Sequence, residues 1–105
     1  MNAELTSLMA ISGAFGCDVV VSTDPSPLEY EAPSGYAIKS IVVREAGVID
    51  EAFTIDKNGT EAKVTNRYWV GEDLLVGDLI TTDDRYPISR FTPTTGSYMV
   101  YFTKL

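Results

Sequence analysis

The residues of this chain best suited to acid–base chemistry are four aspartates in its last third, Asp73, Asp78, Asp83 and Asp84. Two carboxyl groups can act as a general acid and a general base, as they do in glycoside hydrolysis. Each of these four lies among turn residues, where Asp is favoured because its side chain accepts hydrogen bonds from nearby backbone N–H groups. The pattern therefore favours turns over catalysis, and an enzyme that uses Asp83 and Asp84 is the weakest functional hypothesis.

Other kinds of site chemistry lack a recognisable motif. The chain has no histidine and one cysteine, Cys17, so it offers neither a Cys–His pair nor the usual zinc ligands. The segment from Asp56 to Thr60 superficially resembles a calcium loop, but its glycine comes too early and Arg67 stands where the bidentate glutamate would be. We expect no enzyme activity, no cofactor and no metal.

Composition narrows the classes of partner. At 105 residues, with 45% hydrophobic and 22% charged residues, the chain is long enough for one globular domain. Fifteen acidic and eight basic residues give a net charge of -7, and the basic residues are scattered. Binding to nucleic acid or to an anionic membrane surface is therefore not expected.

Features of a membrane-spanning or exported chain are also lacking. The sequence contains no run of about 18 apolar residues, the length needed for a transmembrane helix. Its first 16 residues carry Glu4 and lack the basic leading region of a signal peptide. We expect a protein that is made in the cytoplasm and is not secreted.

Runs of apolar and β-branched residues alternate with turn residues along most of the chain. They predict strands at 18–22, 36–44, 48–55, 61–66, 74–76 with 79–82, 88–91 and 98–102. The run at 18–22 is continuously apolar in its middle, which is typical of a central strand. The spacing predicts an all-β protein, a compact antiparallel β-sandwich or jelly-roll-like domain of about seven to eight strands.

Two further local features follow from this pattern. Three prolines within 24–35 predict a long crossing loop, with Leu28 or Tyr30 tucked in. Asn58-Gly59 predicts a hairpin with a type I′ turn between 48–55 and 61–66. Strict alternation along 48–55 would place Ala52 on the outer face.

The last strand is apolar on both faces. Tyr98, Val100 and Phe102 share one face, while Met99 and Tyr101 share the other. One face can be covered by the domain's own core, so the other needs a second layer of the same chain or a neighbouring subunit.

The N-terminal segment also carries an apolar stripe. Leu5, Leu8 and Met9 have the spacing of one face of a short helix. That helix could cap the β domain, or the segment could be an arm that docks on a neighbour through a hinge at Gly13 and Gly16. We divide the chain into residues 1–16, an N-terminal attachment arm or short helix, and residues 17–105, a β-sandwich domain.

The single tryptophan, Trp69, follows Tyr68. A tryptophan in a small β domain is usually part of the core or its rim, but two aromatic rings can also bind a sugar or a protein partner. Neighbouring residues on a strand point to opposite faces, so the pair forms one platform only if the chain bends.

The last third of the chain resembles the ending of small structural proteins of tailed bacteriophages, such as capsid decoration proteins and head-fibre base domains. The similarity lies in LLVGDLI at 74–80, ISRFTPTTGS at 88–97 and YMVYF at 98–102. It implies a non-enzymatic virion protein, usually a homotrimer, that attaches to a capsid or another virion protein through its N-terminal segment.

Two functional hypotheses result. In the first, the chain is a virion structural protein whose interface residues are Leu5, Leu8, Met9, Tyr98, Met99, Tyr101 and Phe102. In the alternative, it is a small carbohydrate- or protein-binding module that uses Tyr68 and Trp69. The first predicts a large apolar contact between subunits, and the second predicts exposed, coplanar aromatic rings.

Overall fold

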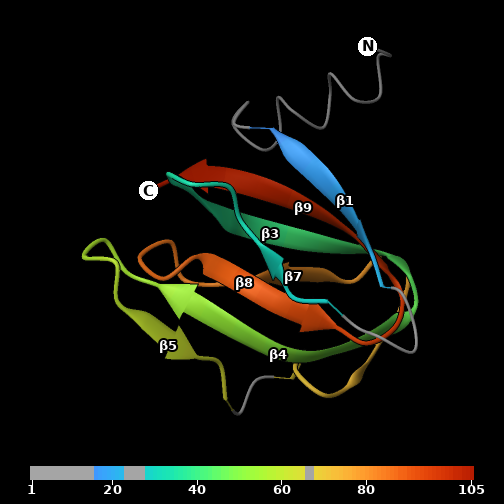
Figure 1. Ribbon diagram of the computed structural model, residues 1–105. Coiled ribbons are helices and arrows are strands. Elements are labelled where there is room, and N and C mark those ends of the chain that lie inside the picture. The colour runs from blue at the N-terminus through green and yellow to red at the C-terminus, as the bar shows by residue number, and fades with distance from the viewer. Residues whose placement is uncertain (1–15, 23–27, 66–67) are drawn as a thin grey trace.

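The computed structural model describes residues 16–22, 28–65 and 68–105, and within these ranges the protein is all-β. The strands are β1 (Cys17–Val21), β2 (Tyr30–Glu31), β3 (Tyr36–Glu45), β4 (Gly47–Ile55), β5 (Glu61–Lys63), β6 (Asp73–Leu74), β7 (Leu79–Thr81), β8 (Ile88–Pro93) and β9 (Ser97–Lys104). All pairs of named strands are antiparallel. The predicted all-β antiparallel class is confirmed (Figure 1).

The strands form one hydrogen-bonded sheet in the order β1-β9-β3-β8-β4-β5, with β2, β6 and β7 paired to β8, β4 and β3. The two groups of longer strands join where Ile38 of β3 pairs with Ile88 of β8. The rings of Phe91 on β8 and Tyr98 on β9 lie 6.0 Å apart, although β3 separates those two strands in the sheet. This short distance shows that the sheet curls on itself. A division into the two stacked sheets of a sandwich stays a prediction.

The core lies on the concave side of the curled sheet. Its largest fully buried side chains include Trp69, Tyr98 and Phe91, surrounded by isoleucines and valines of β3, β4, β7 and β8. Removal of this apolar area from water is the main force that stabilises the fold. Trp69 is only 1% exposed, so the interpretation of Trp69 as a core residue is confirmed.

The local predictions held with two qualifications. The loop after β1 packs Tyr30 against the core, whereas Leu28 is exposed. The hairpin between β4 and β5 forms, and Gly59 has a φ of 84°. Its Gly59 N–H donates to Asp56 O and its Asp56 N–H donates to Thr60 O, which is the bonding of a longer loop and not of a two-residue type I′ turn.

Two strand predictions were wrong. Among the described strands β1 pairs only with β9, so the run at 18–22 is an edge strand and not a central one. On β4, Ala52 is fully buried and not outward-facing. A register shift between Ile49 and Glu51 inserts an extra residue, and this irregularity moves Ala52 to the inner face.

Two bends of the backbone touch at one corner of the sheet. A Cβ atom on Gly47 would overlap the Thr95 carbonyl group and lie 2.6 Å from the Gly96 Cα. A Cβ on Gly96 would lie 2.8 Å from Glu45 O and 3.0 Å from the Tyr98 hydroxyl. That hydroxyl donates a 2.7 Å hydrogen bond to Thr95 O, and this bond stabilises the same corner from the core side.

We expect Gly47→Ala to destabilise the protein by at least about 3 kcal/mol, because the added methyl group has no space and the obstacle is backbone. Chemical denaturation measures the change. Gly35→Ala is the matched control: its Cβ would meet nothing within 4 Å, although the φ of 84° is unfavourable for alanine. The control should therefore lose only about 1 kcal/mol, and equal losses in both variants would contradict close packing at the corner.

Candidate interaction surface

The outer face of the strands β7, β3, β9 and β1 carries a row of apolar side chains. The strand registers place Leu79 opposite Val42, Val42 opposite Met99, and Met99 opposite Val19. Opposed residues in antiparallel strands point to the same side of the sheet, so the four side chains form a continuous line across four strands. We call this face, with Val21 added, the apolar outer face.

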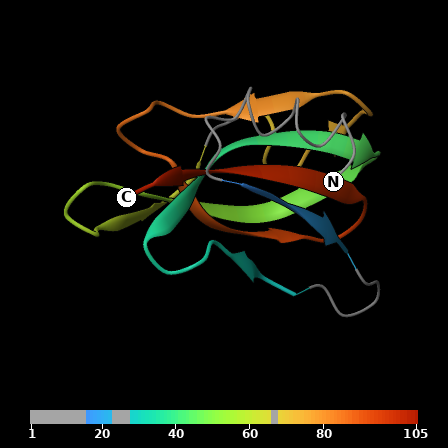
Figure 2. The same cartoon turned by 90° about the horizontal axis from the view of Figure 1, so that it is seen from above.

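Several of its members are open to solvent. Val21 is 64% exposed, Leu79 57% and Val19 41%, while Val42 and Met99 are partly buried. Figure 2 views this half of the sheet from above, with β1 in blue at one margin and β7 in orange at the other. Three exposed apolar side chains therefore lie together on this face, although other exposed apolar residues, among them Leu28, Leu75 and Val76, are not part of it.

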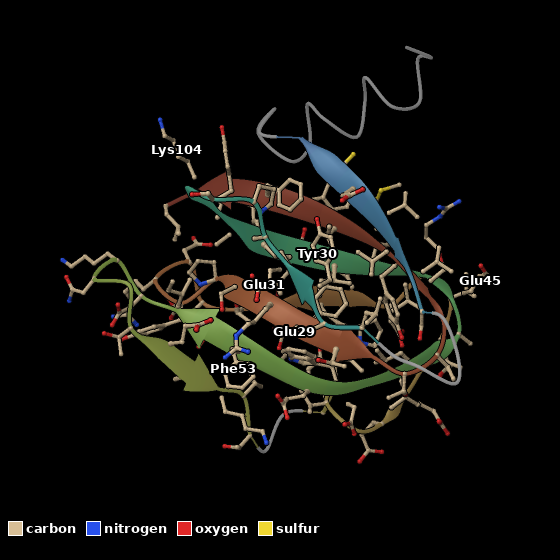
Figure 3. All side chains as sticks on the ribbon, in the orientation of Figure 1. Glu29, Tyr30, Glu31, Glu45, Phe53 and Lys104 are labelled. Carbon is tan, nitrogen blue, oxygen red and sulfur yellow. The ribbon has the colours of Figure 1, made fainter. Side chains whose placement is uncertain are left out.

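The solvent-facing side of β8, β4 and β5 is different in kind. Arg90 lies 3.8 Å from the Phe53 ring centroid and pairs with Glu29 at 2.8 Å and with Glu61 at 3.1 Å. Hydrogen bonds from Ser89 and then from Arg90 lower the pKa of Glu61. Figure 3 labels Phe53 and Glu29 in this charged region, which is typical of a surface that remains in water.

The predicted interface residues of β9 divide between the two faces. Tyr98 and Phe102 point into the core, so they stabilise the domain and do not present a surface. Met99 and Tyr101 lie on the opposite face from Tyr98, as the alternation predicted, and this is the outer face, although Tyr101 is largely buried. Leu5, Leu8 and Met9 lie outside the described residues.

Sequence reasoning missed Val19, Val21, Val42 and Leu79. Their membership of one surface follows from the strand registers, which pair residues separated by up to about eighty positions in sequence. The sequence of β1 offers no alternation that marks Val19 and Val21, because three valines follow one another. A row of this kind can be recognised only once the order of the strands is known.

The two residues proposed for the alternative binding site, Tyr68 and Trp69, differ in their exposure to solvent. Tyr68 is 73% exposed, whereas Trp69 is buried among the core side chains. The two rings therefore do not present a common face to solvent, and Tyr68 is left as a single exposed ring.

Two of the four aspartates of the last third, Asp78 and Asp83, hold turns, whereas Asp73 lies on strand β6 and not in a turn. Asp78 accepts a hydrogen bond from the Leu75 N–H, and Asp83 accepts bonds from the backbone and side chain of Arg85. The side-chain hydrogen bonds of Arg85 are the main cause that lowers the pKa of Asp83 to about 2. A carboxyl group with this pKa is ionised at neutral pH and is therefore a poor general acid.

A cavity of about 340 Å³ lies where the 56–58 hairpin, residues 84–87 and the end of β9 meet. Its lining mixes opposite charges, with Lys57, Arg85 and Lys104 beside Asp56 and Asp84. Arg85 is engaged by Asp83, so the lining does not focus one sign of charge on a ligand.

Residues 16–22, 28–65 and 68–105 contain no cluster of three or more acidic or cysteine side chains arranged to hold a metal ion. Within the same ranges no helix is long and apolar enough to cross a membrane.

Comparison of the chain with family models, with curated proteins and with solved structures gives no match in any of the three.

Replacing Arg85 with Ala should raise the pKa of Asp83 part of the way toward its ordinary 3.8, because the main hydrogen bonds that favour the carboxylate are lost. NMR of the side-chain carboxyl carbon during an acid titration measures this pKa. Because the folded pKa is depressed, the stabilising effect of the contact is present above about 3.8 and is lost as the pH falls toward about 2.

The matched control is Arg44→Ala, which removes one positive charge from β3 and should leave the Asp83 titration unchanged. An ordinary Asp83 pKa in the unmutated protein would contradict the Asp83–Arg85 contact.

Proposed function

We propose that the chain is a non-enzymatic structural protein of a virion, of the capsid decoration or head-fibre type found in tailed bacteriophages. In this proposal it associates with copies of itself through the apolar outer face, as a homotrimer, and attaches to a capsid or another virion protein through residues 1–16. It is made in the host cytoplasm and functions in the virion.

The observation that carries the proposal is the contrast between the two outer faces of the sheet. One face is a charged network around Arg90, and the other is the apolar row from Leu79 to Val19. A surface that remains in water gains nothing from exposed valine and leucine at adjacent positions, whereas burial between subunits removes that area from water. The contrast therefore supports assembly.

The resemblance in 74–102 supplies the virion setting and the trimer. Its residues lie in β6 to β9, and β9 contributes Met99 to the apolar outer face. The alternative, a carbohydrate- or protein-binding module, has less support because Trp69 is buried beside an exposed Tyr68.

Leu79→Glu should dissociate the oligomer, because it places a carboxylate within the apolar contact. We expect association to weaken by at least about tenfold, measured as solution mass by light scattering over a dilution series. Leu79 is already 57% exposed, so the melting temperature of the subunit should change little. Leu28→Glu, which alters an exposed leucine outside this face, should keep the original mass. A chain that is monomeric before any substitution would sink the proposed self-association.

Leu8→Asp should leave the β domain folded, because in this proposal residues 1–16 contact another virion protein and not the core. The thermal melting curve measures this, with Val43→Asp as the control that should unfold the domain, since Val43 is buried. A chain that starts at Gly16 should likewise form an oligomer with the same number of subunits as the full chain. Unfolding of Leu8→Asp would instead assign the N-terminal stripe to the core.

A further inference from the structure

The two ends of the sheet are edges of opposite character. β5 ends the sheet with Glu61 and Lys63, both exposed and both in ion pairs, which is a common way to discourage the pairing of another strand. β1 ends it with Cys-Asp-Val-Val-Val, in which Asp18 is exposed but lies on the opposite side from Cys17, Val19 and Val21, and these three carry no charge. Among the described strands β1 has one neighbour, β9.

Two hydrogen bonds define which backbone groups of β1 face that open edge. Phe102 N–H donates to Gly16 O at 3.2 Å, and Ser22 N–H donates to Gly96 O at 3.1 Å. Even-numbered residues of β1 therefore bond to β9, because the direction of backbone bonding alternates along an antiparallel ladder. The N–H and C=O groups of Cys17, Val19 and Val21 consequently point away from the sheet.

The side chains of these same three residues lie on the apolar outer face. Val19 is opposite Met99, and Val21 and Cys17 lie two positions to either side. An added strand would thus find backbone groups ready to pair and apolar side chains beside them, which is the arrangement used in strand addition.

We infer that the occupant of this edge is the β1 strand of a second copy, paired antiparallel about a two-fold axis at Val19. Val19 then faces the partner's Val19, and Cys17 faces the partner's Val21. Copies joined this way extend the apolar row of one subunit into that of the other, so that the row spans both sheets.

The strand is self-complementary in this register. Asp18 falls opposite the partner's Val20, so that no like charges stand directly opposite each other. Isologous pairing of one patch with itself is what a two-fold contact requires. A strand with several like charges, such as one rich in glutamate, could not pair with itself without opposing them.

One local contact opposes the pairing. The Val19 N–H already donates to the Asp18 carboxylate at 2.8 Å, and this bond has to give way to the partner's carbonyl. The exchange replaces one hydrogen bond by another, so it reduces the gain from pairing without preventing it.

The inference rests on the proposed function in one respect, namely that copies of the chain associate. It goes beyond that proposal because a two-fold contact at the β1 edge uses backbone groups, whereas the proposed trimer contact covers the side chains of the apolar outer face. A particle built from identical subunits can contain both kinds of contact.

Val21→Cys in the full chain tests the inference directly. The introduced thiol would lie opposite the partner's Cys17 in a hydrogen-bonded pair, at a Cα separation of about 5.5 Å, which is within the range of a disulfide. Within one chain the two positions are about 13 Å apart along the strand, so a disulfide can form only between copies. With oxidised glutathione, a covalent dimer should appear on a non-reducing gel.

The matched control is Val21→Cys combined with Cys17→Ser. It keeps the introduced thiol and removes the Cys17 thiol that would lie opposite it in the pair. We expect the single variant to cross-link at least about tenfold faster than this control, because pairing raises the effective concentration of the two thiols. Adding Val19→Pro to Val21→Cys should abolish the difference, since proline lacks the N–H that pairs at the axis and is tolerated on an edge strand.

Equal cross-linking rates in Val21→Cys and its Cys17→Ser control would overturn the edge pairing. If the unmutated chain still has an oligomeric mass that Leu79→Glu abolishes, the proposed function stands without it. If Val21→Cys cross-links rapidly and Leu79→Glu leaves the solution mass unchanged, copies of the chain associate through the β1 edge and not through the apolar outer face.

Discussion

Gly47 and Gly96 bring two bends of the backbone into direct contact, and the curvature of the sheet depends on that contact. The bend between β3 and β4 crosses the turn between β8 and β9 at a distance that leaves no space for a Cβ on either glycine. The Tyr98 hydroxyl holds the second turn through Thr95 O. With the two bends pressed together, β8 and β9 face each other across the core although β3 separates them in the sheet.

This arrangement explains why the two outer faces differ. β9 lies between β1 and β3, and its inner side chains fill the core while Met99 continues the outer row. β8 lies between β3 and β4, and its outer Arg90 is surrounded by carboxylates and the Phe53 ring. The charged side chains around Arg90 find their partners within one chain, whereas the side chains of the apolar row remain partly exposed to water. The exposed apolar face continues onto β1, an edge strand whose side chains on that face carry no charge, which makes β1 the part of the described surface best suited to another copy.

Turn chemistry made most strands predictable. Residues that favour turns, such as Asp, Asn, Pro and Gly, mark where the chain reverses, and the apolar runs between them became β3, β4, β8 and β9 within a few residues of the expected bounds. The faces were less predictable. Alternation correctly placed Met99 and Tyr101 on the face opposite to Tyr98, but it failed at Ala52. There the register shift before Glu51 adds a residue that the residue types do not indicate.

The sequence by itself determined the all-β class, the burial of Trp69 and the two-sided apolar character of β9, because these depend on residue type and local spacing. Only the tertiary structure decided that β1 is an edge and that Leu79, Val42, Met99 and Val19 form one row. The physical reason is that strand order and register arise from contacts between distant segments, which local pattern does not encode. The three valines of β1 would be equally compatible with the centre of a sheet, and the neighbours that β1 acquires in the fold decide how many of them face water.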